Sequence, residues 1–217
     1  LFPHGMLDRW FRHKYPLKHI KKQAYWWLRQ GKILSHARTV CFTTEEERRL
    51  AKKTFWPYHC VEQVTGIGVH NPPNLRSEEE LLFKKFPHLK GKKILLYLGR
   101  VHPKKGLDML IKSFSAMSSE NEFLVIAGPI DESYYYYKKL LRESTKSKNI
   151  IWAGMVEGGL KWEMLRQADA LTLPSHQENF GIVVAEALSV GTPVFITNKV
   201  NLWREVDSYG AGIVAKD

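Results

Sequence analysis

The sequence predicts an α/β protein built on a doubly wound, Rossmann-like parallel sheet. Two segments, Ile94 to Leu98 and Phe123 to Ala127, are apolar at every position, as strands covered by helices on both faces are. From residue 93 onward, strand-like segments alternate with single helical segments, the pattern of right-handed βαβ units. The chain of 217 residues is 44% hydrophobic and 25% charged, a globular composition that excludes disordered and fibrous proteins.

Residues 1–70 predict a smaller region with short elements. Positions 18–34 form an amphipathic helix at about 100° per residue. Its cationic stripe holds Lys18, Lys21, Lys22, Arg29 and Lys32, with Tyr25 among them, and its opposite side holds Ile20, Ala24, Trp27 and Leu34. Short strands are expected at 40–43 and 60–64. Between them, Thr44 and Glu47 form a capping box at the start of a helix that reaches Phe55.

Residues 71–217 predict the larger region. The segment from Gly66 to Pro73 is rich in glycine and proline and marks the boundary between the two regions. A charged helix is expected at 77–86, followed by strands at 93–98, 123–127, 150–153, 170–174 and 193–197. Helices are expected at 106–117, 134–145, 160–167, 180–190 and 202–206.

The positive charge is concentrated in the first region. The chain carries 33 Lys and Arg against 22 Asp and Glu, a balance of +11. Residues 1–60 hold 13 Lys and Arg and 4 Asp and Glu, a balance of +9. Residues 61–217 hold 20 Lys and Arg and 18 Asp and Glu, a balance of +2. The excess therefore needs an explanation within the N-terminal region.

Composition also predicts a location. The apolar runs are too short to span a bilayer. Two cysteines, Cys41 and Cys60, are too few for a disulfide scaffold, which predicts a reducing, cytoplasmic compartment. No secretory signal opens the sequence, and because it starts at Leu1 in mid-pattern we expect a fragment or a trimmed chain.

Ligands of open parallel sheets bind beyond the carboxyl ends of the strands, so the strand-to-helix loops are the candidate site. The loop at 99–106 reads GRVHPKKG. Gly99 and Gly106 allow a tight turn and a close approach to a ligand, while Arg100 and Lys105 place two cations before a helix, a setting for phosphate oxygens. A solvated basic loop is the alternative. The absence of a GxGxxG or Walker pattern from this loop disfavours hydride transfer and P-loop hydrolysis.

The loop after the strand at 170–174 leads to two acidic residues, Glu178 and Glu186. Asn179 is expected to cap the following helix, whose free N–H groups at Phe180 to Val183 form a second anion site. Glu186 has apolar sequence neighbours, so it needs hydrogen-bond donors, and a buried Lys or Arg partner is the alternative to a ligand. Carboxylates suit sugar hydroxyls, so the two loops together predict a site for a sugar nucleotide.

At this point the sequence resembles the group 1 (family 4) retaining glycosyltransferases of GT-B fold. The resemblance rests on Gly99-Arg100 with Lys105-Gly106 and on the spacing of Glu178 and Glu186. It covers nearly the whole chain, because the first region matches as well, in Pro3-His4-Gly5-Met6-Leu7, Trp10, the basic helix, and Ala37-Arg38 before Thr43-Thr44.

The resemblance implies a role for each site residue. Arg100 and Lys105, after Gly99, would hold the donor diphosphate and stabilise the leaving nucleotide. Glu178 would contact the donor sugar, and Glu186 the ribose. The backbone N–H groups that meet sugar and phosphate would be those of Phe180, Gly181, Ile182 and Val183. The base would lie against Gly128, Pro129, Gly154, Met155 and Val156, and His4 would lie beside the donor sugar and acceptor.

The resemblance also implies domains and substrates. Residues 1–70 would be the C-terminal portion of an acceptor-side domain, and residues 71–217 a donor-nucleotide-binding domain with an incomplete C-terminal end. The donor would be a UDP- or GDP-sugar and the acceptor a glycan or lipid-linked sugar. No cofactor or metal is expected, and the sequence has no DxD motif. We expect this chain to bind a nucleotide weakly and not to transfer sugar alone.

The basic helix at 18–34 has three interpretations. Cations beside aromatic residues suit an anionic membrane surface; these aromatics are Trp10, Phe11, Tyr15, Trp26 and Trp27. A solvated helix face explains the charge as well. Basic grooves with aromatics also bind single-stranded nucleic acid, although no nucleic acid partner is expected here.

Other functions explain less of the sequence. A non-catalytic polyanion- or membrane-binding protein leaves Glu178, Glu186 and the loop at 99–106 unused. A GT-B-fold phosphorylase needs a cofactor-binding lysine, which the sequence does not identify, and a sugar-nucleotide epimerase needs further acid/base carboxylates. The sequence therefore predicts a retaining, metal-independent hexosyltransferase of polysaccharide biosynthesis, cytoplasmic or peripheral at the membrane.

Overall fold

The structure is a computed structural model, and it describes residues 1–8, 12, 15–73, 80–117 and 119–216. The chain forms two compact units. Unit 1 comprises Leu1–Gly68 together with Gln177–Gly181, and unit 2 comprises Val69–His176 together with Ile182–Asp217. Each unit is described by itself.

Unit 2 is built on a six-stranded parallel sheet with the order β5-β4-β3-β6-β7-β8. The order turns back between β3 and β6, which is the doubly wound topology predicted from the sequence. The strands are β3 (Lys93–Leu98), β4 (Glu122–Ala127), β5 (Ile150–Gly154), β6 (Ala170–Leu173), β7 (Val194–Thr197) and β8 (Gly212–Ala215).

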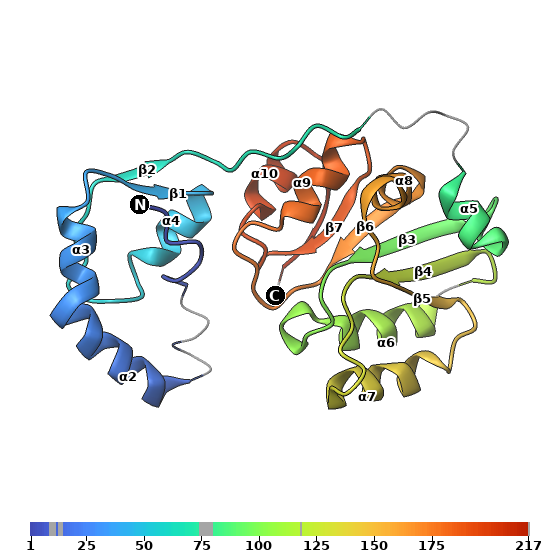
Figure 1. Ribbon diagram of the computed structural model, residues 1–217, viewed down its shortest axis with the longest axis horizontal. Coiled ribbons are helices and arrows are strands. Elements are labelled where there is room, and N and C mark those ends of the chain that lie inside the picture. Colours follow the sequence, from blue (N-terminus) through green and yellow to red (C-terminus); the bar gives the residue numbers. More distant parts are fainter. Residues whose placement is uncertain (9–11, 13–14, 74–79, 118, 217) are drawn as a thin grey trace. The chain divides into compact units, whose positions relative to one another are not determined.

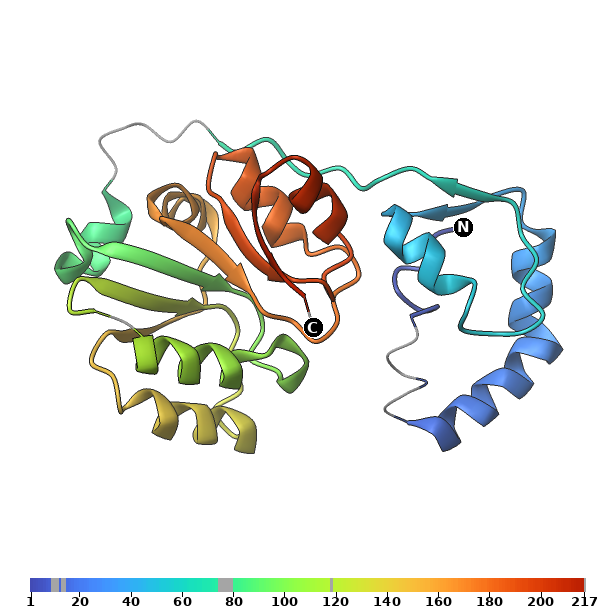
Figure 2. The same ribbon diagram turned by 180° about the vertical axis from the view of Figure 1, so that it is seen from behind.

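Helices cover both faces of this sheet, as Figures 1 and 2 show. On one face lie α6 (Leu107–Met117) and α7 (Tyr135–Ser144). On the other face lie α5 (Leu81–Lys85), α8 (Gly158–Gln167), α9 (Ile182–Ser189) and α10 (Trp203–Ser208). Short 3-10 turns, η2 (Pro87–Leu89) and η3 (Pro103–Lys105), precede β3 and α6.

The core of unit 2 lies on the two central strands. Leu96 on β3 and Leu124 and Val125 on β4 have no exposed surface, because helices cover both faces of these strands. Burying side chains of this kind stabilises a fold by about 1.5–3 kcal/mol each. The uninterrupted apolar runs of the sequence are therefore the strands at the centre of the sheet, as predicted.

Some element boundaries differ from those predicted. The helix expected at 180–190 begins at Ile182, because the backbone of Gly181 is left-handed (φ 79°) and cannot continue a helix. The first strand ends at Phe42 and the helix after it at Ala51. The charged helix α5 begins at Leu81, and residues 77–79 of that prediction lie outside the described residues. Strand β8, at the edge of the sheet, was not predicted at all.

Unit 1 is smaller and has a two-stranded parallel sheet, β1 (Val40–Phe42) and β2 (Glu62–Val64). Before it runs a nearly continuous helical stretch: α2 (Pro16–Tyr25), a π-helical turn η1 (Trp26–Gln30) and α3 (Gly31–His36). The helix α4 (Glu45–Ala51) lies between the strands in sequence. The predicted helix at 18–34 is therefore present, with a π turn in its middle.

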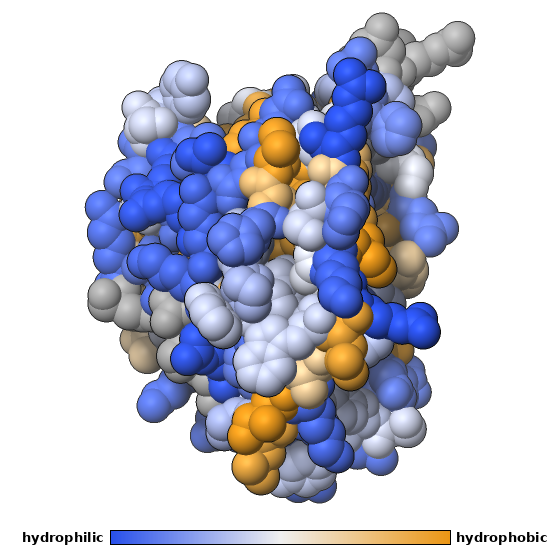
Figure 3. Space-filling model, turned by 90° about the vertical axis from the view of Figure 1, so that its left-hand side faces the viewer, coloured by the Kyte–Doolittle hydropathy of each residue, from blue (hydrophilic) through white to orange (hydrophobic). Residues whose placement is uncertain are grey.

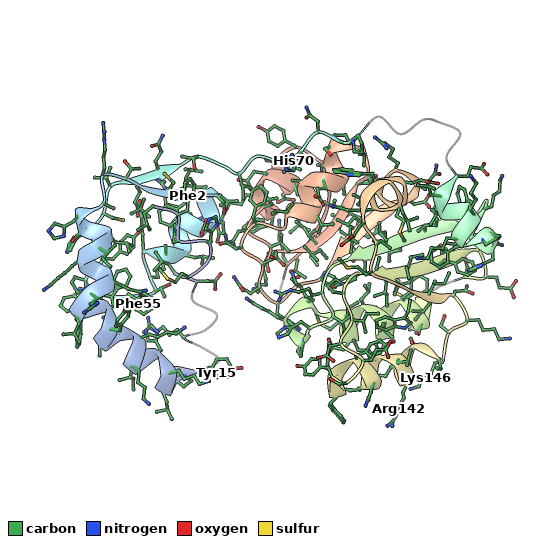
Figure 4. The ribbon with its side chains drawn as sticks, viewed as in Figure 1. Phe2, Tyr15, Phe55, His70, Arg142 and Lys146 are labelled. Carbon is green, nitrogen blue, oxygen red and sulfur yellow. The ribbon has the colours of Figure 1, made fainter. Side chains whose placement is uncertain are left out.

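The helical stretch packs on unit 1 through few side chains. Trp26 is buried and stacks on Phe55 at 4.7 Å between ring centroids, and Leu34 is buried near the end of α3. Phe55 is labelled in Figure 4. Ile20, Ala24 and Trp27, expected opposite the cations, are instead exposed. No residue of α2 is buried, and the buried side chains of the stretch are Trp26, at the start of the π turn, and Leu34 on α3.

Candidate functional site

Two strand-to-helix loops lie against each other at the carboxyl edge of the sheet in unit 2. The amide of His176 donates a hydrogen bond to the Lys104 carbonyl oxygen at 2.9 Å. Gly106 has a left-handed backbone (φ 69°), and a β-carbon placed on it would lie 2.1 Å from the Pro174 carbonyl oxygen. The loop after β3 and the start of the loop after β6 are therefore joined by backbone contacts that no larger residue at 106 permits.

Glycines also join the loops after β3, β4 and β5. Gly128 (φ 136°) would place a β-carbon 2.2 Å from the Gly99 carbonyl oxygen, and its amide donates to the Gly154 carbonyl oxygen at 2.8 Å. Gly99 itself would meet the Tyr97 hydroxyl at 3.2 Å. We expected Gly99 and Gly106 to make room for a ligand. In the structure they make room for neighbouring parts of the protein, which brings the predicted phosphate and base loops together.

The two predicted phosphate-binding cations lie on this edge. Arg100 is exposed, and its carbonyl oxygen accepts a hydrogen bond from the buried Tyr97 hydroxyl at 2.9 Å, which fixes the backbone beneath it. Lys105 is half-buried at the end of η3. His102 caps η3, since its Nδ1 accepts from the Lys104 amide at 3.1 Å. The loop is thus an ordered basic turn, compatible with an anion.

A hollow of about 460 Å³ opens beside Arg100, between the loops after β3 and β4. Besides Arg100 it is lined by His102, Asp131 and Tyr134, among others. Hydrogen bonds from the Ser133 hydroxyl and amide hold the pKa of the Asp131 carboxyl below its usual range. Sequence reasoning did not single out Asp131. The Asp-x-Ser spacing ahead of a helix, typical of a local side-chain turn, is the signal that marks it.

Glu186 has a partner inside the fold. Its Oε1 accepts from Lys161 Nζ at 2.6 Å, and the two side chains are 13% and 26% exposed. Lys161 comes from α8 and Glu186 from α9, both on the same face of the sheet. The alternative given for Glu186, a buried basic partner, is therefore what the structure contains. One carboxylate oxygen of Glu186 takes part in the described ion pair.

Residues 177–181 group with unit 1, and among them Glu178 and Phe180 are half-buried. Asn179 does not cap α9 as expected. Its Oδ1 is buried without a hydrogen-bond partner among the described residues, and the helix begins three residues later. Of the four backbone amides predicted at the helix start, those of Ile182 and Val183 are the first N–H groups of α9. Those of Phe180 and Gly181 lie in the loop before it.

His4 lies in unit 1, in a tight turn. Among the described positions, His4 is the non-glycine residue with a positive φ, at 46°. Gly5 follows with a φ of 74°. The His4 ring stacks on Phe2 at 5.7 Å (Figure 4 labels Phe2). Trp10, which the sequence motif placed near this turn, and Phe11 lie outside the described residues.

Glu47 holds the His4 turn in place. Its Oε1 accepts from the Gly5 amide at 2.8 Å, and its Oε2 accepts from the Thr43 amide and hydroxyl at 2.8 and 2.7 Å. Thr44 caps α4 as predicted, accepting from the Glu47 amide at 3.0 Å. The expected return bond from the Glu47 carboxylate to Thr44 is replaced by bonds to Thr43 and Gly5. Sequence reasoning therefore missed the connection between Glu47 and His4.

The loop predicted to contact the base follows β5. Gly154 has a left-handed backbone (φ 70°), Met155 is exposed and Val156 is buried in the core. Pro129, in the neighbouring loop, is exposed. In unit 2 the structure thus brings Gly99, Arg100, Lys105, Gly128 and Gly154 to one edge. Within the part of the chain that the structure describes, no three His, Cys, Asp or Glu side chains gather as a metal site.

Comparison with known proteins identifies relatives of this chain. A family model described as glycosyl transferases group 1 matches residues 78–217. An uncharacterized glycosyltransferase of Methanocaldococcus jannaschii is 32% identical over 127 residues, covering 58% of this chain and 32% of that protein. A mannosylfructose-phosphate synthase of Agrobacterium fabrum is 32% identical over 127 residues, covering 54% and 28%. The chain spans about a third of the length of these two relatives.

Solved structures share the fold. WaaG, a glycosyltransferase involved in lipopolysaccharide biosynthesis, matches with a TM-score of 0.67 at 19% identity, covering 82% of this chain and 49% of that one. A sucrose-phosphate synthase of Thermosynechococcus elongatus matches with a TM-score of 0.68 at 20% identity, covering 86% and 47%. The α/β fold with its parallel sheet, predicted from the sequence as GT-B, is therefore confirmed.

Proposed function

Because the chain belongs to the glycosyl transferases group 1 family, we propose that it takes part in transferring a sugar from a nucleotide-sugar donor to an acceptor, with retention of configuration and without a metal. The donor is a UDP- or GDP-sugar, and the acceptor is a glycan or a lipid-linked sugar. The two named relatives are a glycosyltransferase and a mannosylfructose-phosphate synthase, so each transfers or joins sugar units by name.

One observation carries this proposal. At the carboxyl edge of the unit 2 sheet, the loop with Arg100 and Lys105 is joined to the loop before α9 through Gly106 and Pro174. Cations, the N-terminal amides of α9 and the Glu186 carboxylate thus come from neighbouring elements of one unit. Cations and helix N-termini bind phosphate, and carboxylates bind sugar hydroxyls. A nucleoside diphosphate carries both groups.

The chemistry assigned to this edge is stabilisation of a leaving group. The bond between sugar C1 and the diphosphate oxygen breaks, and the nucleoside diphosphate departs with the electron pair. Arg100 and Lys105 offset the negative charge that develops on that oxygen, and α9 contributes its N-terminal amides. Fixed donors of this kind contribute about 3–4 kcal/mol each to a transition state. Fixed cations would then take the role that a metal has in other transferases.

Retention implies that the acceptor hydroxyl attacks C1 on the face from which the diphosphate leaves. The hydroxyl oxygen forms the new bond, and its proton passes to the departing phosphate oxygen, so no protein carboxylate is needed as nucleophile. We assign Glu178 to the donor sugar hydroxyls and His4 to the region of the donor sugar and acceptor. Glu186 would bind the ribose, oriented by Lys161, and Gly154, Met155 and Val156 would contact the base.

We also propose a cytoplasmic location. Both cysteines of the chain, Cys41 and Cys60, are free thiols in the structure. Free thiols persist in reducing compartments.

The test is a calorimetric titration of the chain with UDP and with GDP. Binding is the readout because the chain spans only part of its relatives. Arg100→Ala and Glu186→Ala are each paired with a matched control, Lys112→Ala on α6 and Glu143→Ala, which removes the acid of a surface ion pair on α7. We expect one nucleotide to bind to the parent chain. Its affinity should fall at least about tenfold in each of the two site variants and stay unchanged in the two controls. Binding of neither nucleotide, or equal binding by all variants, would contradict the proposal.

A further inference from the structure

Unit 1 contains a groove that the proposed transfer reaction does not use. It has a volume of about 470 Å³ and lies between the α2–η1 helix and the segment at 52–56. Ile20, Ala24 and Trp27 line one wall, and Lys53 and Trp56 line the other. Most of its exposed surface is apolar, and its lining includes the cations Arg12, Lys52 and Lys53. An apolar groove with a basic rim is an amphipathic anion site.

The two walls are held together by hydrogen bonds. The Gln23 side chain donates to the Trp56 carbonyl oxygen and accepts from the Trp56 amide at 3.3 Å. The Trp27 indole donates to the same carbonyl at 2.6 Å, and the Trp26 indole donates to the Pro57 carbonyl at 2.7 Å. Four bonds thus fix the helix against the segment, so the groove is formed before any partner binds.

Apolar side chains continue from the groove along the outer side of the helix. Leu17 is 79% exposed, Ile20 65% and Leu28 71%, and Trp56 across the groove is 73% exposed. Aliphatic residues of this size at such exposure cost solvation free energy unless another surface covers them. Figure 3 faces unit 1 and shows hydrophobic patches directly beside strongly hydrophilic ones on this side.

The cations form a second strip beside the apolar one. At about 100° per residue, Lys18, Lys21 and Lys22 of α2 lie within roughly a third of a turn, next to the position of Leu17. The helical stretch carries two further cations, Arg29 on η1 and Lys32 on α3. All five are exposed, and the sequence has no Asp or Glu between Asp8 and Glu45. Among the described residues, no ion pair is made by Lys21, Arg29 or Lys32.

Four acidic residues of unit 1 have partners outside the helical stretch. Glu45 pairs with Arg48 at 2.6 Å, Glu46 with Arg49 at 3.6 Å and Glu62 with Lys52 at 2.9 Å. Glu47 accepts backbone hydrogen bonds in the interior. Lys21, Arg29 and Lys32 therefore present exposed charge outside the described ion pairs, and their complement is a negatively charged partner with an apolar body.

We propose that the α2–η1 helix and the Trp56 segment dock on the surface of an anionic lipid bilayer. Leu17, Ile20 and Leu28 enter the boundary between headgroups and acyl chains, and Trp27 and Trp56 lie at the headgroup level. The cations of the helical stretch contact the lipid phosphates. A single-stranded nucleic acid fits less well, because aliphatic side chains offer no stacking surface for bases. Docking is in the plane of the bilayer: no described helix has the length and apolar character that crossing a membrane demands. This site is independent of nucleotide binding in unit 2.

Vesicle co-sedimentation tests the proposal with the full chain. Vesicles of phosphatidylcholine alone are compared with vesicles containing 30% phosphatidylglycerol, at low and physiological salt. Lys21→Glu/Lys22→Glu reverses two charges of the strip. Lys146→Glu/Lys148→Glu is the matched control, with the same change of net charge at exposed positions after α7 (Lys146 is labelled in Figure 4). Leu17→Ser/Leu28→Ser removes apolar groups at exposed positions and leaves the charge unchanged.

We expect binding to the anionic vesicles only, weakened at least tenfold by Lys21→Glu/Lys22→Glu, weakened at least fivefold by Leu17→Ser/Leu28→Ser, and unchanged in the control pair. Circular dichroism confirms that each variant is folded. Equal binding by the control and the strip variant would overturn the proposal. So would binding that the leucine variant leaves intact, or a single-stranded RNA that binds more tightly than the vesicles.

Discussion

The two units present different surfaces to a partner. In unit 2, glycine loops at the carboxyl edge of the sheet pack on one another, and Arg100 and Lys105 extend from an ordered turn. In unit 1, a helix packs through Trp26 and Leu34 and leaves aliphatic side chains and lysines exposed. Close backbone packing suits a small polyanion with fixed geometry. An open face with separate apolar and cationic strips suits an extended surface that has no fixed geometry.

Charge follows the same division. Residues 1–60 carry a balance of 13 − 4 = +9, against 20 − 18 = +2 for residues 61–217. In unit 2 the cations that matter are few and placed by the backbone, whereas in unit 1 they form a strip. We infer that unit 2 recognises its ligand by geometry and unit 1 by accumulated charge and apolar area. Each of the following predictions tests one side of this comparison.

The largest effect is expected at Gly106. Gly106→Ala introduces a β-carbon 2.1 Å from the Pro174 carbonyl oxygen, so the loops after β3 and β6 must separate. Gly91→Ala is the matched control, because Gly91 has a similar φ of 74° with open space around it. Both variants bear the cost of a left-handed backbone, about 1 kcal/mol. We expect Gly106→Ala to lose a further 2 kcal/mol or so in urea unfolding and to lose nucleotide binding. Equal stability of the two variants would mean that the loop contact does not shape the site.

The next effect is expected at Glu47 in unit 1. Glu47→Ala leaves the Gly5 and Thr43 amides and the Thr43 hydroxyl without their acceptor, at a cost of about 2–3 kcal/mol. Glu45→Ala is the control on the same helix, where a more exposed pair with Arg48 is worth about 0.5 kcal/mol. Hydrogen exchange at Gly5 should rise in Glu47→Ala alone. A Gly5 amide as protected as in the parent would contradict the role given to Glu47.

A smaller effect is expected at Lys161. Lys161→Met removes the partner of Glu186 and leaves a partly buried carboxylate, so nucleotide affinity should fall about three- to tenfold through loss of its orientation. A double-mutant cycle with Glu186→Gln separates the orientation of Glu186 by Lys161 from the effect of removing the Lys161 charge alone. If the two substitutions add without coupling, the pair does not act as a unit in binding.

The smallest effect is a pH dependence of unit 1. Burial, then the charges of Arg12 and Lys22, hold the pKa of His19 below its usual value of 6.5. The unfolded chain therefore binds the proton more readily, so stability is full above pH 6.5 and falls as the pH drops through that value. His19→Gln should flatten this part of the profile in thermal unfolding. A variant whose melting temperature follows the parent's at every pH would show that His19 carries no linkage.

The units also differ in how much of them the sequence predicts. In unit 2, Ile94 to Leu98 and Phe123 to Ala127 are buried except for the half-buried Leu95 and Phe123, and a continuous apolar run is visible without knowledge of tertiary contacts. Strand β8 escaped prediction because it lies at the sheet edge, starts with Gly212 and alternates between half-buried and exposed residues. The doubly wound sheet follows from the same regular pattern, whereas the family was inferred from the motifs at 99–106 and from the spacing of Glu178 and Glu186.

In unit 1, local rules misplace side chains. A uniform 100° spacing places Ile20 and Trp27 on the apolar side of the helix, whereas in the structure both are exposed and Trp26 is buried. The capping-box rule predicts the amide of Thr44 as the partner of Glu47, whereas the carboxylate bonds to Gly5, 42 residues earlier. Neither outcome is encoded in local spacing, because both depend on contacts between distant segments.

The site shows the same limit. Motif spacing singled out Arg100, Lys105 and Glu186 as candidates. Lys161, which pairs with Glu186, comes from another helix and was not singled out from the sequence. Asn179 was expected to be a cap because of its residue type, and the left-handed Gly181 moves the helix start beyond its reach. Residue type and spacing predict the chemistry proposed for this edge. The side chains that pair with its residues inside the protein can be identified only from the fold.

Hydrogen–deuterium exchange of the full chain, with two ligands in turn, tests the division between the units most directly. We predict that the nucleotide that binds slows exchange at 99–106, 154–157 and 180–186 and leaves 16–30 unchanged. Anionic vesicles should slow exchange at 16–30 and 52–56 and leave 99–106 unchanged. If the nucleotide protected the basic helix, or if vesicles protected the loop at 99–106, the assignment of one ligand class to each unit would be wrong.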